Sequence, residues 1–140
     1  SWGTVNQPFT RNFIYTNGAD AGHVLNSAAG SINTADLNSA TDLIMFAGAS
    51  EMASPLIVGE QAVITSIYNG AASKQAKNGT AGSTINTGTQ GFQGIQLMSY
   101  DAGIGFASGY VSELHIMNEA ISDVNRAALE ANQLAFYGLP

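Results

Sequence analysis

The C-terminal segment of residues 109–140 constrains the fold most, because a strand signal there leads directly into a helix whose two ends are both marked. Residues 110–117 are rich in branched and aromatic side chains, which suit a half-buried sheet. Strand alternation places Leu114 and Ile116 on one face, and we expect this pair to point into the core. The segment therefore predicts a strand followed at once by a helix.

The helix signals start at Ser122, whose hydroxyl can accept a hydrogen bond from a free amide of the first turn. Gly138 stands at the turn-permissive position after the helix, and Pro140 cannot continue it. We expect a face of small apolar residues to lie against a sheet and the polar face to lie opposite. Leu129 and Phe136 fall outside the apolar face, so the sequence does not decide which side of the helix is buried. The apolar face comprises Val124, Ala127, Ala128, Ala131, Leu134 and Ala135, and the polar face comprises Arg126, Glu130 and Gln133.

Upstream of residue 109, short apolar stretches alternate with turn signals. Asn-Gly pairs at 69–70 and 78–79 lie nine residues apart, which is the spacing of successive hairpin turns. Residues 8–16 alternate as a strand, and Arg11 interrupts the aromatic face, so we expect this strand near a sheet edge. Residues 42–47 form a compact apolar run that predicts a strand buried on both sides. The pattern predicts an all-β, antiparallel β-sandwich with one short C-terminal α-helix.

A family resemblance supports this architecture. The last strand reads G-x-x-x-E-hydrophobic, and an Asn-containing corner, I-S-D and an alanine-rich helix ending in Y-G follow it. Residues 61–140 thereby resemble concanavalin A-like and laminin-G-like jelly rolls of bacterial or phage type. The resemblance implies a single lectin-like jelly-roll domain over residues 1–140, either complete or part of a longer protein, and it implies no particular function. The matching residues are Gly109, Glu113, Leu114, Ile116, Asn118, Ile121, Ser122, Asp123, Arg126, Leu129, Glu130, Tyr137 and Gly138.

Composition excludes several classes of function. Four Lys and Arg stand against ten Asp and Glu, and the net charge of −6 opposes nucleic-acid binding. The chain has no cysteine, so disulfides, zinc–thiolate sites and cysteine nucleophiles are excluded. No apolar run approaches the ~20 residues of a membrane-spanning helix, so we expect no membrane insertion.

Catalysis lacks a recognisable motif. Glycosidases need two carboxylates facing one cleft, and serine hydrolases need a nucleophile elbow such as G-x-S-x-G; neither pattern occurs. Glu113 and His115 share a strand face, where they could transfer a proton or simply bond to each other within the sheet. We therefore expect a protein that is not an enzyme and that needs no cofactor, with calcium left open.

Two stretches are candidates for binding sites. Asp36 and Asp42 lie in a segment that echoes a calcium loop, but Thr41 replaces its glycine and Ala47 its bidentate glutamate. The two aspartates remain metal candidates, and the alternative is that each forms a turn by bonding its own backbone. The glycine-rich segment 99–110 carries the ligand-binding candidates. They could stack on and hydrogen-bond to a sugar, and the alternative for Tyr100 and Phe106 is that they fill the core. These candidates are Tyr100, Asp101, Phe106 and Tyr110.

The first functional hypothesis is a non-catalytic carbohydrate-recognition or adhesion module on a virion or cell surface. The alternative is a structural virion decoration or appendage protein that uses the same fold to pack against neighbouring proteins or against copies of itself. We expect an extracellular or virion-surface location for either, with glycans or surface proteins as partners.

Overall fold

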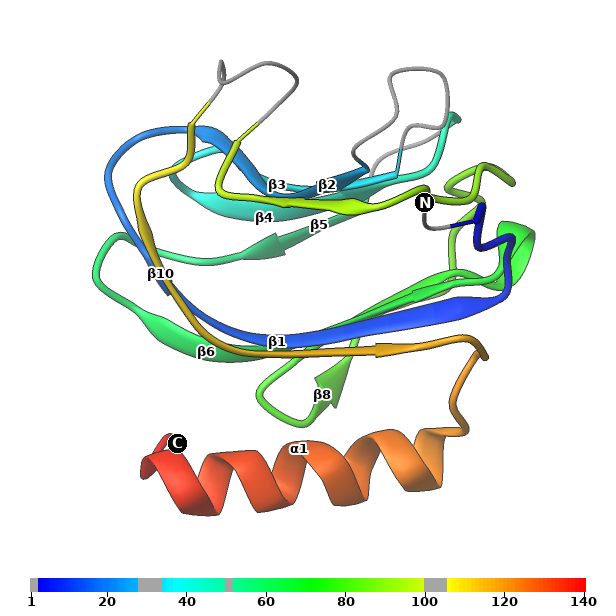
Figure 1. The fold of residues 1–140 in the computed structure, drawn as a ribbon. Coiled ribbons are helices and arrows are strands. Elements are labelled where there is room, and N and C mark those ends of the chain that lie inside the picture. The colour runs from blue at the N-terminus through cyan, green and yellow to red at the C-terminus, as the bar shows by residue number, and fades with distance from the viewer. Residues whose placement is uncertain (1–2, 28–33, 50–51, 100–105) are drawn as a thin grey trace.

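The computed structural model describes residues 3–27, 34–49, 52–99 and 106–140, which form ten strands in two sheets, a short 3-10 turn and one α-helix (Figure 1). The first sheet contains β1 (Phe9–Asn17), β6 (Gln61–Tyr68), β7 (Lys74–Lys77), β8 (Thr80–Ala81) and β10 (Gly109–Met117). The second sheet contains β2 (Gly22–Ser27), β3 (Ala35–Asn38), β4 (Asp42–Phe46), β5 (Met52–Pro55) and β9 (Ile95–Leu97). The helix is α1 (Asp123–Tyr137), and the 3-10 turn is Gly70–Ala72.

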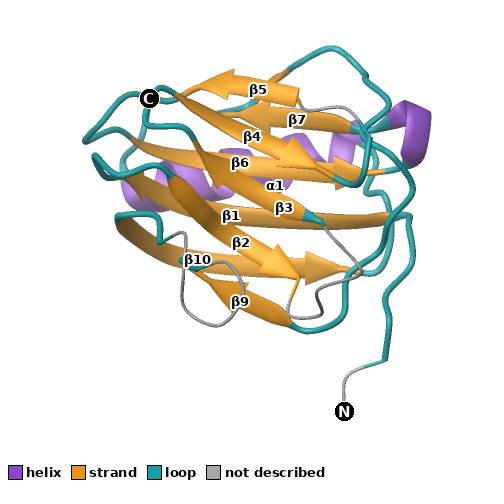
Figure 2. Ribbon diagram, turned by 90° about the horizontal axis from the view of Figure 1, so that it is seen from above, coloured by secondary structure: helices purple, strands orange, loops and turns teal. Residues whose placement is uncertain are grey.

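Both sheets are antiparallel, with strand orders β10-β1-β6-β7-β8 and β5-β4-β3-β2-β9. They stack face to face, and α1 lies against the outer face of the first sheet (Figure 1). Seen from above, the second sheet covers the first, α1 lies behind both, and β5 runs beside β7 at one edge (Figure 2). The prediction of an all-β sandwich with one C-terminal helix is confirmed.

Aromatic and aliphatic side chains fill the space between the sheets. The Phe9 ring stacks on the Tyr68 ring at 4.6 Å and meets the Phe92 ring edge-on at 4.7 Å. A second group of buried apolar side chains gathers around Phe13 and Leu43. These contacts come from inward-facing residues of both sheets, as expected of a sandwich.

Arg11 lies in the middle of this core. It stands on β1, which lies between β6 and the edge strand β10, so the prediction of a strand near a sheet edge is confirmed. Its side chain is fully buried, and its Nη1 lies 3.1 Å from Oδ2 of Asp36 on the opposite sheet. The rings of Phe9, Tyr68 and Phe92 surround the guanidinium, with centroids 5.0–5.4 Å away. A buried arginine needs such a partner because an unpaired charge there is very costly.

A β-bulge sets which side chains of β10 reach the core. The register between β1 and β10 shifts at Ile14/Tyr15, so that Val111 lies opposite Tyr15 and Leu114 lies opposite Phe13. Val111 and Leu114 therefore both pack against the core. Leu114 follows the sequence prediction, whereas Ile116 stays exposed near the end of the strand.

The apolar run of residues 42–47 alternates instead of being buried throughout. Leu43 and Met45 are buried, whereas Ile44 and Phe46 are only half-buried. Their side of the second sheet has no helix over it in the described part of the chain (Figure 1). The prediction of burial on both faces is therefore wrong.

The ends of α1 agree with the sequence. Ser122 accepts a hydrogen bond of 3.2 Å from the Asn125 amide, and Gly138 adopts a left-handed conformation with φ 65°. The N–H of Leu139 then donates to the Leu134 carbonyl at 2.9 Å, which satisfies an orphan acceptor of the last turn.

The face that α1 turns to the sheet is the polar one, contrary to the expectation for its alanines. Arg126, Glu130 and Gln133 are the buried helix residues, and the apolar face points away from the sheet. Gln133 exchanges two amide hydrogen bonds with Asn12, at 2.7 and 3.1 Å. Glu130 accepts a bond of 2.6 Å from the Thr65 hydroxyl and pairs with Arg126. The outer face of β1 and β6 presents polar partners, which decide how the helix is turned.

No helix among the described residues has both the length and the hydrophobicity needed to cross a lipid bilayer.

Candidate functional site

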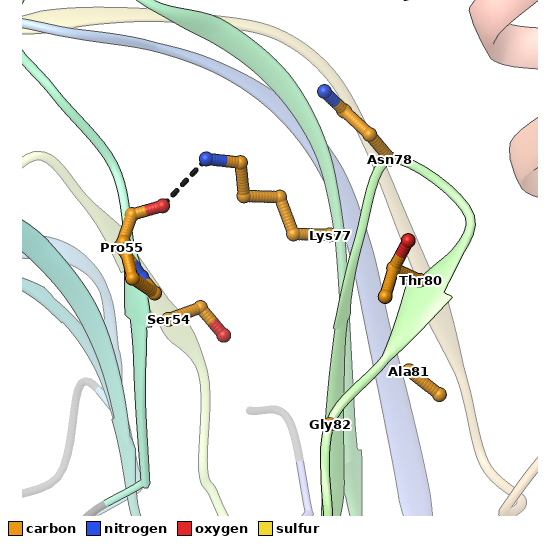
Figure 3. A pocket seen from close by; sticks show the side chains of 7 residues that line it. All are labelled: Ser54, Pro55, Lys77, Asn78, Thr80, Ala81 and Gly82. Atoms are coloured by element: carbon orange, nitrogen blue, oxygen red, sulfur yellow. Dashed lines mark hydrogen bonds between the residues drawn. The ribbon is translucent and has the colours of Figure 1, made fainter.

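An open pocket of about 460 Å³ lies at the edge of the sandwich, where β5 of one sheet faces β7 and β8 of the other (Figure 3). This volume falls in the range of small-molecule sites. The pocket joins two parts of the chain that are more than twenty residues apart. Its lining consists of Ser54, Pro55, Lys77, Asn78, Thr80, Ala81 and Gly82.

Lys77 links the two sides of the pocket. Its Nζ donates to the Pro55 carbonyl at 2.5 Å, as the dashed line in Figure 3 shows, and lies 2.6 Å from Oε1 of Glu60. Glu60 also accepts a bond of 3.1 Å from the Ile57 amide through its other oxygen. Lys77 thus ties the end of β7 to β5 and to the loop that follows β5.

The turn between β7 and β8 forms the opposite wall. Asn78 and Gly79 both have positive φ, at 47° and 83°, as an Asn-Gly hairpin turn requires. Asn78 Oδ1 accepts a bond of 2.9 Å from the Val63 amide, and the Asn78 amide donates to the Val63 carbonyl at 2.9 Å. The turn is therefore anchored to β6, which leaves the amide NH₂ of Asn78 beside the pocket.

The pocket lining is chemically simple. Ser54 and Thr80 supply hydroxyl groups that both donate and accept, and Asn78 supplies amide donors. Pro55 and the methylene groups of Lys77 supply small apolar surfaces next to them. The lining contains no carboxylate, and its one charge, on Lys77, is already paired. Such a site can hydrogen-bond to an uncharged polyol while packing against its C–H groups.

The predicted glycan-binding residues lie elsewhere in the fold. Tyr100 and Asp101 fall outside the described residues. Phe106 and Tyr110 are 60% and 74% exposed, so neither fills the core. Phe106 bridges His23 at the start of β2, and Tyr110 lies opposite Thr16 at the end of β1, so both flank the β1–β2 connection.

The predicted metal ligands have different surroundings. Asp36 is fully buried, and its two oxygens bind Arg11 and the Ser66 hydroxyl. Burial raises the pKa of Asp36, against the lowering effect of the Arg11 guanidinium. Asp42 lies at the start of β4, where it accepts a bond of 2.8 Å from the Thr41 hydroxyl. The described residues contain no group of three or more acids and histidines placed to hold a metal ion. Asp36 serves the core, and calcium binding stays a prediction.

Glu113 and His115 contact each other, as expected for neighbours on one strand face. Gln133 of α1 donates a bond of 3.0 Å to Glu113. The hydrogen bond from His115, followed by that from Gln133, lowers the pKa of Glu113. The pair is therefore part of the contact between the sheet and α1.

Sequence reasoning missed the edge pocket. The Asn-Gly signal at 78–79 located its hairpin, but only the stacking of the sheets brings residues 54–55 next to it.

The architecture defines a class of β-sandwich that also occurs in toxins and sialidases. The botulinum neurotoxin serotype G binding domain superposes with a TM-score of 0.73 at 8% identity, over 93% of this chain and 37% of that one. Sialidase from Trypanosoma rangeli in complex with sialic acid superposes with a TM-score of 0.64 at 13% identity, over 94% of this chain and 26% of that one. Botulinum neurotoxin type C, whose cell entry depends on interaction with two ganglioside molecules, superposes with a TM-score of 0.62 at 10% identity, over 90% of this chain and 36% of that one.

This chain therefore spans between about a quarter and just over a third of those structures. At such identities the likeness shows the fold alone. No protein-family model matches the sequence, and no curated protein is detectably similar to it.

Proposed function

We propose that the protein is a non-catalytic carbohydrate-recognition module, displayed on a virion or cell surface, and that the edge pocket binds the sugar. The observation that carries the proposal is the lining of that pocket, which combines hydroxyl and amide groups with small apolar surfaces. The fold supports it, because sandwiches of this architecture occur in a sialidase that binds sialic acid and in a neurotoxin that interacts with gangliosides.

Recognition follows from the placement of the lining groups. Ser54 on β5 and Thr80 on β8 face the pocket from opposite sheets, so both hydroxyls can bond to one sugar ring. Pro55 and the methylene groups of Lys77 offer apolar contact to the C–H groups of that ring. The Lys77 bond to Pro55 holds the two walls together, which fixes the width of the pocket before a ligand arrives. Preorganisation of this kind lowers the entropic cost of binding.

Binding without hydrolysis is proposed because the pocket lacks the required acids. Retaining glycosidases hold two carboxyl groups about 5–5.5 Å apart on either side of the bond that they cleave. None of the residues that line the pocket is an acid. Glu113 and His115 lie between the sheet and α1, away from this edge.

A glycan array tests the proposal. Saturable binding is expected for the wild type, and Thr80→Trp should abolish it, because Thr80 lies opposite Lys77 in the β7–β8 hairpin and an indole there fills the pocket. Ala128→Trp is the matched control, since Ala128 is exposed on the outward face of α1. Loss of binding in Tyr110→Ala but not in Thr80→Trp would move the site to the aromatic pair of Phe106 and Tyr110. Absence of binding to every glycan would contradict the proposed function.

The structural alternative is favoured by a separate observation, the outward face of α1. Val124 and Phe136 are 78% and 81% exposed, and the alanines between them are exposed as well. An uncharged helix face of this kind suits packing against a neighbouring protein or a second copy. Sedimentation analysis tests it: a concentration-dependent oligomer that Phe136→Ser disrupts supports the structural role, and a monomer at all concentrations contradicts self-assembly.

A further inference from the structure

Every lysine and arginine of the chain is paired with a carboxylate. The sequence has four such residues, and all four lie in the described part of the chain. The pairs are Arg11 with Asp36, Lys74 with Asp123, Lys77 with Glu60, and Arg126 with Glu130. A ligand that carries a negative charge therefore meets no lysine or arginine that lacks a carboxylate partner.

The two arginines are also out of reach. The Arg11 side chain is fully buried between the sheets. The Arg126 side chain, on the face of α1 that is turned to the first sheet, is almost fully buried as well. Removing either counterion would leave a buried charge, which proteins tolerate poorly. Neither arginine can turn outward to hold the carboxylate, sulfate or phosphate of a ligand.

The two lysines are partly exposed but occupied. Lys74 bonds to both oxygens of Asp123, at 3.0 and 3.2 Å. Lys77, the only cation that lines the edge pocket, bonds to the Glu60 carboxylate and to the Pro55 carbonyl. An anionic sugar could use Lys77 only by displacing Glu60, which itself holds the Ile57 amide.

The two histidines do not supply the missing charge. Burial lowers the pKa of His23, which therefore stays neutral at pH 7. His115 contacts the Glu113 carboxylate. The whole chain carries a net charge of −6, so its field repels anions at a distance as well.

We infer that the edge pocket selects uncharged saccharides and rejects sialylated, sulfated and phosphorylated ones. The inference rests on the proposed function and adds the class of ligand. Hydroxyl and amide groups bond well to neutral sugars, whereas an acidic sugar finds only paired cations and a repulsive field. The preference would distinguish this protein from the sialidase that binds sialic acid and the neurotoxin that interacts with gangliosides.

The first test is a glycan array printed with neutral oligosaccharides and the sialylated and sulfated forms of the same structures. The wild type should bind neutral members, and each acidic counterpart should bind several-fold more weakly. Equal or tighter binding of the acidic forms would overturn the inference and leave the proposed function intact. No binding to any member would overturn both.

The second test frees the pocket cation. Glu60→Gln removes the charge that neutralises Lys77 but keeps a side-chain oxygen for the Ile57 amide. Affinity for the sialylated form should rise roughly two- to fivefold, as expected for a new exposed charge pair, and the gain should vanish at high salt. Glu119→Gln is the matched control, because it makes the same charge change on an exposed side chain away from the pocket. A gain in both variants, or in neither, would contradict the role of the Lys77–Glu60 pair.

Discussion

Arg11 and Asp36 join the two sheets through a fully buried ion pair, with Nη1 and Oδ2 3.1 Å apart. Asp36 also accepts a bond of 2.6 Å from Ser66 on β6, and Arg11 donates one of 2.8 Å to the Thr34 hydroxyl. Because each charge bonds groups on the facing sheet, the pair fixes how the sheets lie on each other.

Replacing Asp36 with alanine should lower the free energy of unfolding by about 3–5 kcal/mol, since it leaves the Arg11 charge buried without a partner. Urea denaturation followed by circular dichroism measures the change. The double variant Arg11→Met/Asp36→Leu should recover much of the loss, because two apolar side chains carry no desolvation penalty. Asp20→Ala, the same substitution at an exposed aspartate, is the control. A loss in Asp36→Ala below about 1 kcal/mol would contradict the assigned role.

Substitutions on the two faces of α1 should change the stability of the protein by different amounts. Gln133→Ala removes the partner of the buried Asn12 amide and should cost about 1–3 kcal/mol of unfolding free energy. Phe136→Ser, on the outward face, should change the stability of the monomer by no more than about 0.5 kcal/mol. Thermal unfolding of dilute samples measures the stability of both variants. A larger loss in Phe136→Ser than in Gln133→Ala would show that the apolar face is the buried one.

The N-cap of α1 gives a third expectation. Ser122→Ala removes the acceptor for the Asn125 amide and should destabilise the protein by about 0.5–2 kcal/mol. Ser122→Asp should restore the stability, because a carboxylate accepts the same bond and meets the positive end of the helix dipole. Equal stability of the alanine and aspartate variants would contradict the cap.

Glu113 makes a pH-dependent contribution. Its pKa is lowered in the folded protein, mainly by the bond from His115, so the carboxylate stabilises the fold above its ordinary pKa of 4.5. Glu113→Gln should therefore be less stable than the wild type at pH 7, by no more than about 1 kcal/mol.

That difference in stability should shrink as the pH falls from 4.5 through the lowered pKa, because protonation removes the same interaction from the wild type. Denaturation curves at pH 7, 5 and 3 measure it. Glu119→Gln, the same substitution on an exposed side chain, should match the wild type at pH 7. A difference between Glu113→Gln and the wild type that is equally large at pH 3 and pH 7 would contradict the assignment.

Local signals predicted the architecture well. The cap at Ser122, the left-handed Gly138 and the Asn-Gly turn at 78–79 each act through neighbouring residues, so the sequence alone reveals them. Residues 109–140 in particular form the expected strand and helix.

Contacts between distant residues could not be predicted in the same way. Nothing in the sequence indicated that Arg11 is buried, because its partner, Asp36, belongs to the other sheet. Helical periodicity favoured burial of the alanines of α1, but Asn12 and Thr65 on the sheet bind the polar face instead. The bulge beside Tyr15 turned Val111 inward, and no sequence signal marked it.

The candidate site shows the same limit. Tyr110 was chosen because an aromatic in a glycine-rich segment suits sugar binding, and it is indeed exposed. Ser54 and Thr80 carry no motif, and they share a pocket only because β5 and β8 lie at the same edge of the two sheets.

Backbone amide NMR of the isotope-labelled protein, titrated with a neutral oligosaccharide that binds on the array, tests the central claim most directly. The account predicts saturable shifts that cluster at residues 54–55 and 77–82, with little change in the same residues when the sialylated form is added. Shifts confined to residues 106–110, or stronger shifts with the sialylated form, would contradict it.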